Sequence, residues 1–289
     1  MVEYILGNYL VDTGKITKEQ LKATLDKQDS VRVKLGLIAV SEGMMTLEQA
    51  DEVNRLQAIM DQRFGDIAVS KGYLTDEQIG KLLKMQGNSY LMFVQTLVDN
   101  GYASMEELDQ LVNDFRQANG YSNSEMDAFK SDDVDRIIPL LIPDEGKQFA
   151  DVIAIAVKTI IRLIDRHVYV GNAAMVNAFP SENQVSQALE GTDGIIDCFS
   201  ERDGALLNVC SVFGKEDFAK LDMDSLDAAG EFLNCINGLY ASALSPQGKF
   251  LELMPPDYTD VTSQAKPAIC RVPIFVGDHG LYFTVAELA

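Results

Sequence analysis

The sequence lacks tryptophan and has only two histidines, His167 and His279, which stand far apart without cysteine or carboxylate companions at metal-ligand spacing. The four cysteines are Cys198, Cys210, Cys235 and Cys270. They form no Cys-x-x-Cys pair, so we expect no metal site and no disulfide framework, and we interpret them as buried thiols in a reducing compartment. No Walker loop, Gly-x-Gly-x-x-Gly or Gly-x-Ser-x-Gly motif is present, which removes these nucleotide-binding and hydrolase signatures.

Basic residues and long apolar runs are also scarce. The chain has 24 Lys and Arg against 44 Asp and Glu, a formal net charge of −20, and such a surface repels the phosphate backbone of nucleic acids. The most apolar stretch, VIAIAVKTIIRLI, is too short to span a membrane and contains Lys158 and Arg162. The first residues, MVEYILGNYLVDTGK, lack the apolar core of a signal peptide. We therefore expect a cytoplasmic protein with no membrane span and no nucleic-acid partner.

One period organises the first third of the chain. Glycine, threonine and glutamine recur every 29 residues, at Gly7, Gly36 and Gly65, at Gly14, Gly43 and Gly72, at Thr17, Thr46 and Thr75, at Gln20, Gln49 and Gln78, and at Gln28, Gln57 and Gln86. A weaker fourth copy continues with Gly101, Ser104 and Glu107. A repeat of this length indicates stacked supersecondary units.

Each repeat predicts a pair of helices. A short apolar stretch ends at a glycine, where helices often finish with a positive φ. Thr-x-x-Gln follows, or Ser104-x-x-Glu107 in the fourth copy, and this is the pattern of a capping box that opens a second helix. The earlier glycine, Gly7 and its equivalents, lies inside a helical pattern and predicts close packing or a ligand contact. We predict an all-α domain of about four helix pairs over residues 1–118, and a linker over residues 119–146 that begins polar and rich in Gly, Ser and Asp.

The repeats match in part a longer motif, a basic residue, Leu-Gly-x-x-Leu and, ten residues on, Leu-x-x-x-Leu-x-x-Gln, from which the departures include Ile5, Ala39, Ala50, Asn54 and Ala68. This spacing resembles the N-terminal domain of MshE-type and type II secretion ATPases, in which a tandem pair can bind cyclic di-GMP. The second and third repeats are the adjacent pair that carry both basic residues. The resemblance implies a cyclic di-GMP site at Lys34, Leu35, Gly36, Gln57, Arg63, Gly65 and Gln86. The alternative is that the leucines form a core and the glutamines brace helices in a docking or sensing module.

Residues 224–244 predict one amphipathic helix on which the C-terminal half depends. The apolar positions recur at steps of three and four and are Leu226, Ala229, Leu233, Ile236, Tyr240 and Ala243. The opposite face carries Asp227, Glu231 and Asn234, and Asp224 is the expected N-cap. Glycine in a helix interior costs about 1 kcal/mol relative to alanine. Gly230 and Gly238 therefore indicate a surface kept bare for the approach of another backbone.

Glu231 and Asn234 are three residues apart and so point the same way from a helix. A carboxylate can hold a cation of a partner, and a carboxamide offers both a donor and an acceptor with which to orient a water molecule. Positioning of this kind is a recurring part of phosphoryl hydrolysis. The plainer interpretation is a solvated helix face.

The run Asp227-x-x-x-Glu231-x-x-Asn234, with Gly238 and a later Pro255 or Pro256, resembles the CheC/CheX chemotaxis phosphatases. The resemblance covers roughly residues 147–289. It implies hydrolysis of the aspartyl phosphate of a response-regulator receiver domain, with Asn234 placing the attacking water and Glu231 pairing with a receiver lysine. The Mg²⁺ of that reaction belongs to the receiver, so no cofactor is expected on this chain. Asp227, Gly230 and Gly238 are expected to contact or support the partner.

The C-terminal half predicts an α+β domain with an antiparallel sheet. A helix over residues 147–167 is expected to precede three strands, NAAMVNAF, GIIDCFSE and ALLNVCSVF. The central helix and three more strands, KFLELMP, AICRVPIFV and GLYFTVAEL, follow. Asp203-Gly204 and residues 278–280 are interpreted as hairpin turns. CheX-like domains share this order and can pair through their sheets, so the resemblance also implies a possible homodimer.

Three functions remain open from the sequence. The first is a CheX-like phosphatase acting on a receiver domain. The second is a signalling adaptor that binds partners without turnover, and the third is a regulator that responds to cyclic di-GMP through the N-terminal repeats.

Overall fold

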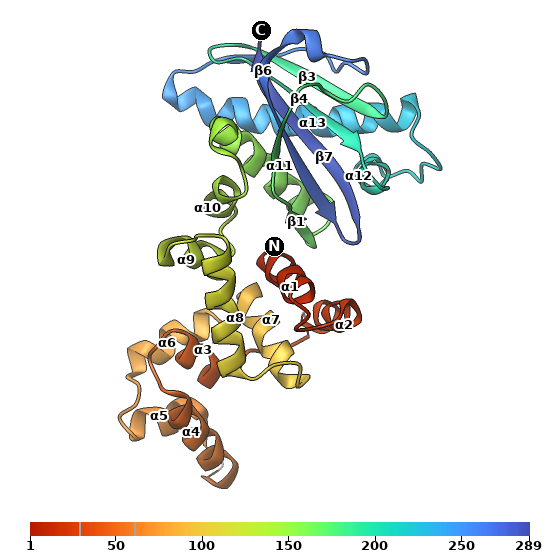
Figure 1. Cartoon of the computed structure of the whole chain (residues 1–289). Helices are drawn as coiled ribbons and strands as arrows, with labels where there is room; N and C mark the ends of the chain where they lie inside the picture. Colours follow the sequence, from red (N-terminus) through yellow and green to blue (C-terminus); the bar gives the residue numbers. More distant parts are fainter. Residues whose placement is uncertain (29, 61) are drawn as a thin grey trace. The chain divides into compact units, whose positions relative to one another are not determined.

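The computed structural model describes residues 1–28, 30–60 and 62–289 and shows an α+β fold, with helices in the N-terminal part and an antiparallel sheet in the C-terminal part (Figure 1). The chain divides into two compact units. One is Val2–Asp132, and the other is Asp133–Ala289 together with Met1. No helix among the described residues combines the length and the apolar character needed to cross a membrane.

Helices follow one another in pairs through the N-terminal unit. They are α1 (Val2–Asp12), α2 (Lys18–Gln28), α3 (Leu35–Ser41), α4 (Leu47–Met60), α5 (Phe64–Ser70), α6 (Asp76–Lys84), α7 (Ser89–Asp99) and α8 (Met105–Ala118). Helix α7 packs against both α1 and α2, so the fourth helix pair meets the first within this unit.

The predicted capping boxes are confirmed. The backbone N–H of Gln78 donates to Thr75 Oγ1 (3.2 Å), and the N–H of Thr75 donates to Gln78 Oε1 (2.8 Å). The same reciprocal pair occurs in the first, second and fourth units. The glycines that end the first helices, Gly14, Gly43, Gly72 and Gly101, have φ between +64° and +73°. Local signals therefore define both ends of each turn between helices.

The earlier glycines of the repeats serve close packing. A Cβ on Gly36 would lie 3.0 Å from the ring of Phe64, and one on Gly65 would lie 3.3 Å from Ile79. A Cβ on Gly7 would overlap the Leu21 side chain. The sequence left close packing and a ligand contact open for these glycines, and the observed contacts account for close packing against a neighbouring helix.

The expected linker over residues 119–146 is wrong as a description of the backbone, because this stretch is largely helical. It contains α9 (Asn123–Ser131), α10 (Val134–Ile137) and the 3₁₀ helices η1 (Ile138–Leu140) and η2 (Asp144–Phe149). Ser122 and Glu125 form another capping box at the start of α9. Met126, Ala128 and Phe129 are buried. The polar composition of this stretch belongs to the exposed side of a helix with a small apolar face.

The C-terminal unit is built on one antiparallel sheet. Its elements are α11 (Ala150–Leu163), β1 (Val168–Val170), β2 (Ala174–Val176), β3 (Gln184–Gly191), β4 (Ile195–Glu201), α12 (Ala205–Gly214), α13 (Met223–Leu244), η3 (Ser245–Gln247), β5 (Leu251–Leu253), η4 (Thr262–Gln264), β6 (Ala265–Val276) and β7 (His279–Leu288). Among the described residues the seven strands run in the order β1-β6-β7-β4-β3-β5, with β2 also paired to β6.

The antiparallel sheet is confirmed, but the expected order of helix, three strands, helix and three strands is wrong. Residues 205–213, predicted as a strand after a hairpin at Asp203-Gly204, form α12 instead. An apolar run of this length fits either structure, and burial of Ala205, Leu206, Val209 and Cys210 follows a helical spacing. Strand β3 was not predicted. The hairpin between β6 and β7 is confirmed, but its turn lies at Gly277 and Asp278 rather than at residues 278–280, because His279 and Gly280 pair within β7. Gly277 has a φ of +58° in this turn.

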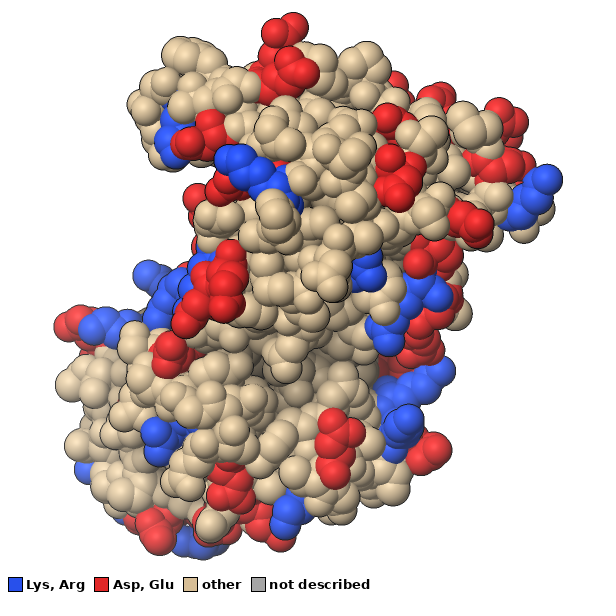
Figure 2. Space-filling view, turned by 45° about the horizontal axis from the view of Figure 1, so that its top comes forward, with Lys and Arg blue, Asp and Glu red and all other residues tan. Residues whose placement is uncertain are grey.

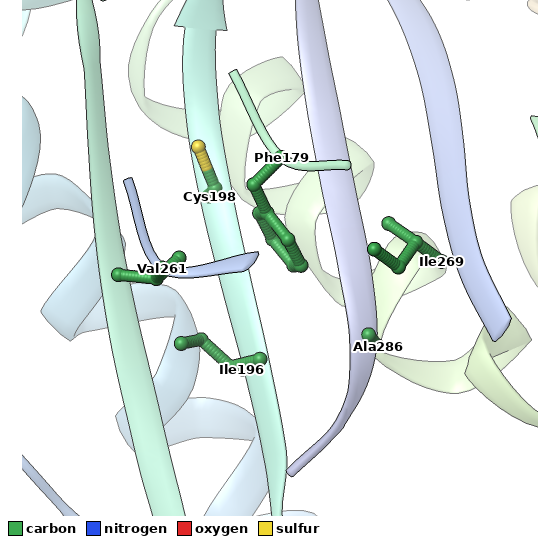
Figure 3. Close-up of a cluster of buried hydrophobic side chains, with 6 residues drawn as sticks. All are labelled: Phe179, Ile196, Cys198, Val261, Ile269 and Ala286. Atoms are coloured by element: carbon green, nitrogen blue, oxygen red, sulfur yellow. The ribbon is translucent and has the colours of Figure 1, made fainter. Parts of the chain in front are cut away.

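Helices and loops cover opposite faces of the sheet. On β4, Asp197 and Phe199 face α13, since Phe199 stacks on Phe232 of that helix with ring centroids 6.0 Å apart. Alternate residues of a strand point to opposite faces. Ile196 and Cys198 accordingly join the buried cluster of Figure 3 on the other face, which is completed by Phe179, Val261, Ile269 and Ala286. The sheet is thus covered on both faces, and α13 packs against one of them.

Candidate functional site

Helix α13 carries the predicted site. It begins one residue earlier than predicted, and its N-cap is Asp222 rather than Asp224, because Asp222 Oδ1 accepts the N–H of Ser225 (3.3 Å) and Ser225 Oγ accepts the N–H of Asp222 (2.8 Å). The apolar face is buried as predicted except for its last member, Ala243, which is exposed near the C-terminal end. This burial fixes which face of the helix meets solvent.

The exposed face presents Asp227, Glu231 and Asn234 together. The hydroxyl of Tyr258 donates to Asp227 Oδ1 (3.1 Å). Burial, followed by the hydrogen bond to Asp227, raises the pKa of Tyr258 to about 12, so this hydroxyl keeps its proton at neutral pH. Tyr258 therefore holds Asp227 in place, and Glu231 lies one helical turn further on.

The two glycines of this helix differ in their surroundings. A Cβ on Gly230 would lie 3.2 Å from Pro256 Cβ, and Gly230 is buried. The space expected for a partner backbone at Gly230 is therefore filled by this chain's own Pro256, which leaves Gly230 a supporting role in the site and no open surface. A Cβ added to Gly238 would meet no neighbouring atom of the described residues within 4 Å, so that backbone is open.

Asn234 is exposed, yet its amide is tied to the interior. Gln187 on β3 is 1% exposed, and its Nε2 donates to Asn234 Oδ1 (3.0 Å) and to the Met254 carbonyl (2.7 Å). Gln187 Oε1 accepts from Nδ2 of buried Asn237 (2.9 Å), and the same Nδ2 donates to Asp197 Oδ1 (3.0 Å). A chain of side-chain hydrogen bonds thus runs from the core to the exposed amide.

Asp197 lies at the buried end of this chain and is 0% exposed. Burial raises its pKa to about 7, against the lowering effect of the hydrogen bond from Asn237. Its second oxygen, Oδ2, has no hydrogen-bond partner among the described residues. Asp197 is therefore a core carboxyl that titrates near neutral pH.

The N-terminal unit brings most of the predicted nucleotide-site residues together in one groove of about 1,050 Å³. Six of the seven line it, namely Lys34, Leu35, Gln57, Arg63, Gly65 and Gln86. Gly36 does not line this groove and faces an adjoining smaller cavity.

Polar contacts within the chain already engage several side chains of the groove. Lys34 Nζ lies 2.8 Å from Asp99 Oδ1 in an exposed ion pair. Gln86 Nε2 donates to the Val33 carbonyl (2.6 Å), and Gln86 Oε1 accepts from the Arg32 guanidinium (3.3 Å and 3.4 Å). Arg32 is thus a second cation beside Lys34, and the motif did not identify it.

The sequence also failed to identify Gln187 and Tyr258 at the α13 site. Neither stands in a local pattern, since their partners lie on another element of the unit. Cys235 is exposed, which corrects the expectation that all four cysteines are buried. Within the described residues no group of three or more His, Cys, Asp or Glu side chains is placed to hold a metal ion.

Charge of both signs is spread over the surface. On the face shown in Figure 2, Lys and Arg side chains are interspersed with Asp and Glu. The acidic excess of the composition therefore does not form one continuous field on that face. The acidic pair Asp227 and Glu231 on α13 remains a local feature of its helix.

No family model matches the chain, and no curated protein matches it in sequence. Solved structures that resemble about half of the chain include CheC/CheX-like chemotaxis proteins and FliM proteins. Chemotaxis protein CheX from Desulfovibrio desulfuricans is 14% identical, with a TM-score of 0.40, and the match covers 50% of this chain and 99% of that one. The CheX–CheY–BeF₃–Mg complex from Borrelia burgdorferi is 15% identical, with a TM-score of 0.40, over 48% of this chain and 96% of that one. The FliM middle domain from Vibrio alginolyticus is 14% identical, with a TM-score of 0.33, over 50% and 90%.

Proposed function

We propose that the C-terminal unit hydrolyses the aspartyl phosphate of a response-regulator receiver domain, as a CheX-like phosphatase. The single observation that carries this proposal is the exposed pair of Glu231 and Asn234 on α13, in which the Asn234 amide is held by buried Gln187. The substrate class comes from the resemblance of the Asp227, Glu231 and Asn234 motif to the CheC/CheX phosphatases.

In the proposed reaction Asn234 orients a water molecule toward the phosphorus atom. The water oxygen bonds to phosphorus, and the bond between phosphorus and the aspartyl oxygen breaks. Inorganic phosphate and the free receiver carboxylate are the products, and the water proton passes to phosphate and solvent. Glu231 holds a cationic side chain of the receiver, and the receiver supplies Mg²⁺, which stabilises charge on the phosphoryl oxygens.

The experiment measures loss of phosphate from receiver domains of the same organism, phosphorylated with acetyl phosphate. Wild type is compared with a Glu231→Ala/Asn234→Ala double variant and with Asn234→Ala alone. We expect turnover to fall about 100-fold or more when the positioning amide is removed. Asn208→Ala removes an exposed helical asparagine on α12 and serves as the control. Equal rates of phosphate loss with and without the wild-type protein contradict the proposal, and binding without turnover supports the adaptor alternative.

A second candidate function belongs to the N-terminal unit. We propose that its groove binds cyclic di-GMP, because six of the seven residues that the motif assigns to this ligand line one groove. Arg32, Lys34 and Arg63 supply cations for the phosphates and for stacking on guanine. The bound dinucleotide then regulates the chain's activity.

Titration calorimetry with cyclic di-GMP tests this candidate. We expect binding heat in wild type that is lost in Lys34→Ala and in Arg63→Ala. Lys18→Ala removes an exposed lysine outside the groove and controls for the change in net charge. Absence of heat at high ligand concentration contradicts the candidate, and cyclic di-AMP tests whether guanine is required.

A further inference from the structure

We propose that Gln187 is a positioning residue, which the Met254 carbonyl holds in one orientation and which in turn fixes the orientation of the Asn234 amide at the surface. The consequence for turnover rests on the proposed phosphatase function, whereas the orientation itself concerns this chain alone. The two ends of a carboxamide differ, since the NH₂ group donates and the oxygen accepts. The orientation of the Asn234 amide therefore decides whether its NH₂ group or its oxygen faces a partner.

The Met254 carbonyl sets the direction. A carbonyl oxygen only accepts hydrogen bonds, so the Gln187 atom 2.7 Å from it must be the NH₂ group. The same Nε2 lies 3.0 Å from Asn234, and the Asn234 atom that accepts its second hydrogen must be Oδ1. One backbone oxygen thus assigns the orientation of two amides in series.

The local sequence explains why this carbonyl is available. The N–H of Met254 donates to Ala188, and Asp257 exchanges both backbone hydrogen bonds with Ser186. Between Met254 and Asp257 stand Pro255 and Pro256, which have no N–H to donate. The prolines interrupt the backbone hydrogen bonds between this segment and β3. Gln187 lies opposite the interruption, and its side-chain NH₂ group donates to the Met254 carbonyl.

A second contact enforces the same orientation from the core. Gln187 Oε1 accepts from Asn237 Nδ2 (2.9 Å), and this Nδ2 also donates to Asp197 Oδ1 (3.0 Å). If Gln187 were turned over, its NH₂ group would face the NH₂ group of Asn237 and its oxygen would face the Met254 carbonyl. Both contacts would be repulsive in a buried site, where unpaired polar groups are costly.

The result is an exposed asparagine with a fixed polarity. Asn234 Oδ1 is held by Gln187, which turns Nδ2 away from the sheet and leaves one lone pair of Oδ1 for a water hydrogen. An exposed amide without such an anchor samples both orientations and several rotamers. Gln187 therefore pre-organises the group that places the attacking water.

The test replaces Gln187 by methionine, which keeps the length of the side chain and removes the amide. Gln184→Met is the matched control, because Gln184 lies three residues away on β3, is also 1% exposed and also donates to a backbone carbonyl, that of Thr259, but does not contact Asn234. The substrate is a receiver domain that acetyl phosphate has phosphorylated. We expect Gln187→Met to lower kcat about 10- to 100-fold, with KM within about twofold of the wild-type value. Gln184→Met should keep kcat within about twofold of wild type. A folded Gln187→Met variant with wild-type kcat overturns the proposal.

A second measurement needs no substrate and no variant of the core. In ¹⁵N-labelled wild type, the Asn234 side-chain NH₂ signal is assigned by its loss in Asn234→Ala. We expect an order parameter near about 0.8, typical of a rigid group, rather than below about 0.6. A flexible NH₂ signal overturns the inference even if the phosphatase is active. A rigid NH₂ signal in a protein without phosphatase activity supports the orientation and contradicts the proposed function instead.

Discussion

The two candidate sites differ in what holds their polar side chains. At the α13 site, exposed Asn234 is bonded to Gln187, and Gln187 is bonded to buried Asn237 and to a backbone carbonyl. In the N-terminal groove, Lys34 is held by an ion pair with Asp99 in which the two side chains are 61% and 33% exposed. The first site is anchored in a core, and the second is held by contacts that water reaches.

This difference has energetic consequences. Turning Asn234 leaves a buried N–H of Gln187 without its acceptor, which costs about 1–3 kcal/mol. Exposed ion pairs typically contribute about 0–1 kcal/mol, so an anionic ligand can take Lys34 from Asp99 at little cost. We therefore expect the α13 site to be preformed and the groove to rearrange if it binds a ligand.

The largest expected effect contrasts two asparagines one turn apart on α13. Asn237→Ala removes the donor to Asp197 and to Gln187 Oε1 and should lower the free energy of unfolding by about 3 kcal/mol, since two buried acceptors lose their partner. Asn234→Ala should cost much less, about 1 kcal/mol, because only the exposed end of the chain of hydrogen bonds is lost. Urea denaturation followed by circular dichroism measures both.

Equal losses in the two variants would remove the distinction between the buried and the exposed asparagine. If the C-terminal unit has the proposed phosphatase function, Asn234→Ala should lose turnover while it remains folded.

The next effect in size is a pH dependence at the buried end of the network. The pKa of Asp197 is raised to about 7 in the folded chain, so the folded state binds this proton more tightly than the unfolded state. Its contribution to stability is therefore present at low pH, falls as pH rises from about 4 to about 7, and is constant above that. Asp197→Asn keeps an acceptor for Asn237 and removes the titration. Between pH 5 and pH 8 the stability of the variant relative to wild type should rise by about 2–3 kcal/mol.

Urea denaturation at a series of pH values measures the difference in stability between Asp197→Asn and wild type. The other titrating groups are the same in both proteins, so their contributions cancel. A difference that does not change with pH would show that Asp197 ionises normally in the folded chain. It would also mean that the interior end of the network is more hydrated than its burial indicates.

The N-terminal helices could be predicted because their signals are local. Thr75 and Gln78 are three residues apart and bond to each other, so the sequence alone contains the whole interaction. The same signal stands at Ser122 and Glu125, where the polar composition around it led to the prediction of a linker. A capping box is therefore stronger evidence for a helix than polar composition is against it.

The remaining features depend on contacts between distant residues. Gln187 bonds to groups 47, 50 and 67 residues away, and no local pattern marks it. Glu231 and Asn234 could be identified because a helix places positions three apart on one face. The residue that orients Asn234 comes from the pairing of β3 with the segment after β5, which the sequence does not reveal.

A smaller effect separates the two glycines of α13. Gly238→Ala should raise stability by about 0.5–1 kcal/mol, because a helix interior gains from alanine and the added Cβ meets no described neighbour within 4 Å. Gly230→Ala should lack this gain, since the rigid Pro256 ring would have to move. Thermal denaturation compares the two variants, and equal gains would contradict the close packing at Gly230. If Gly238→Ala is stable but binds the receiver more weakly, the bare backbone there contacts the partner.

The smallest expected effect tests the rearrangeable groove. Asp99→Asn keeps an oxygen acceptor for Gln95 and Lys34 but removes the charge of the ion pair. Stability should change by less than about 0.5 kcal/mol, since the pair is exposed. If the groove binds cyclic di-GMP, loss of the competing negative charge beside Lys34 should strengthen binding about two- to fivefold at low salt, with a smaller gain at high salt, where exposed charges are screened. Calorimetry at two salt concentrations measures this. A loss of stability above about 1 kcal/mol would show instead that Asp99 is a structural anchor, and the groove would then resemble the α13 site in being fixed before any ligand arrives.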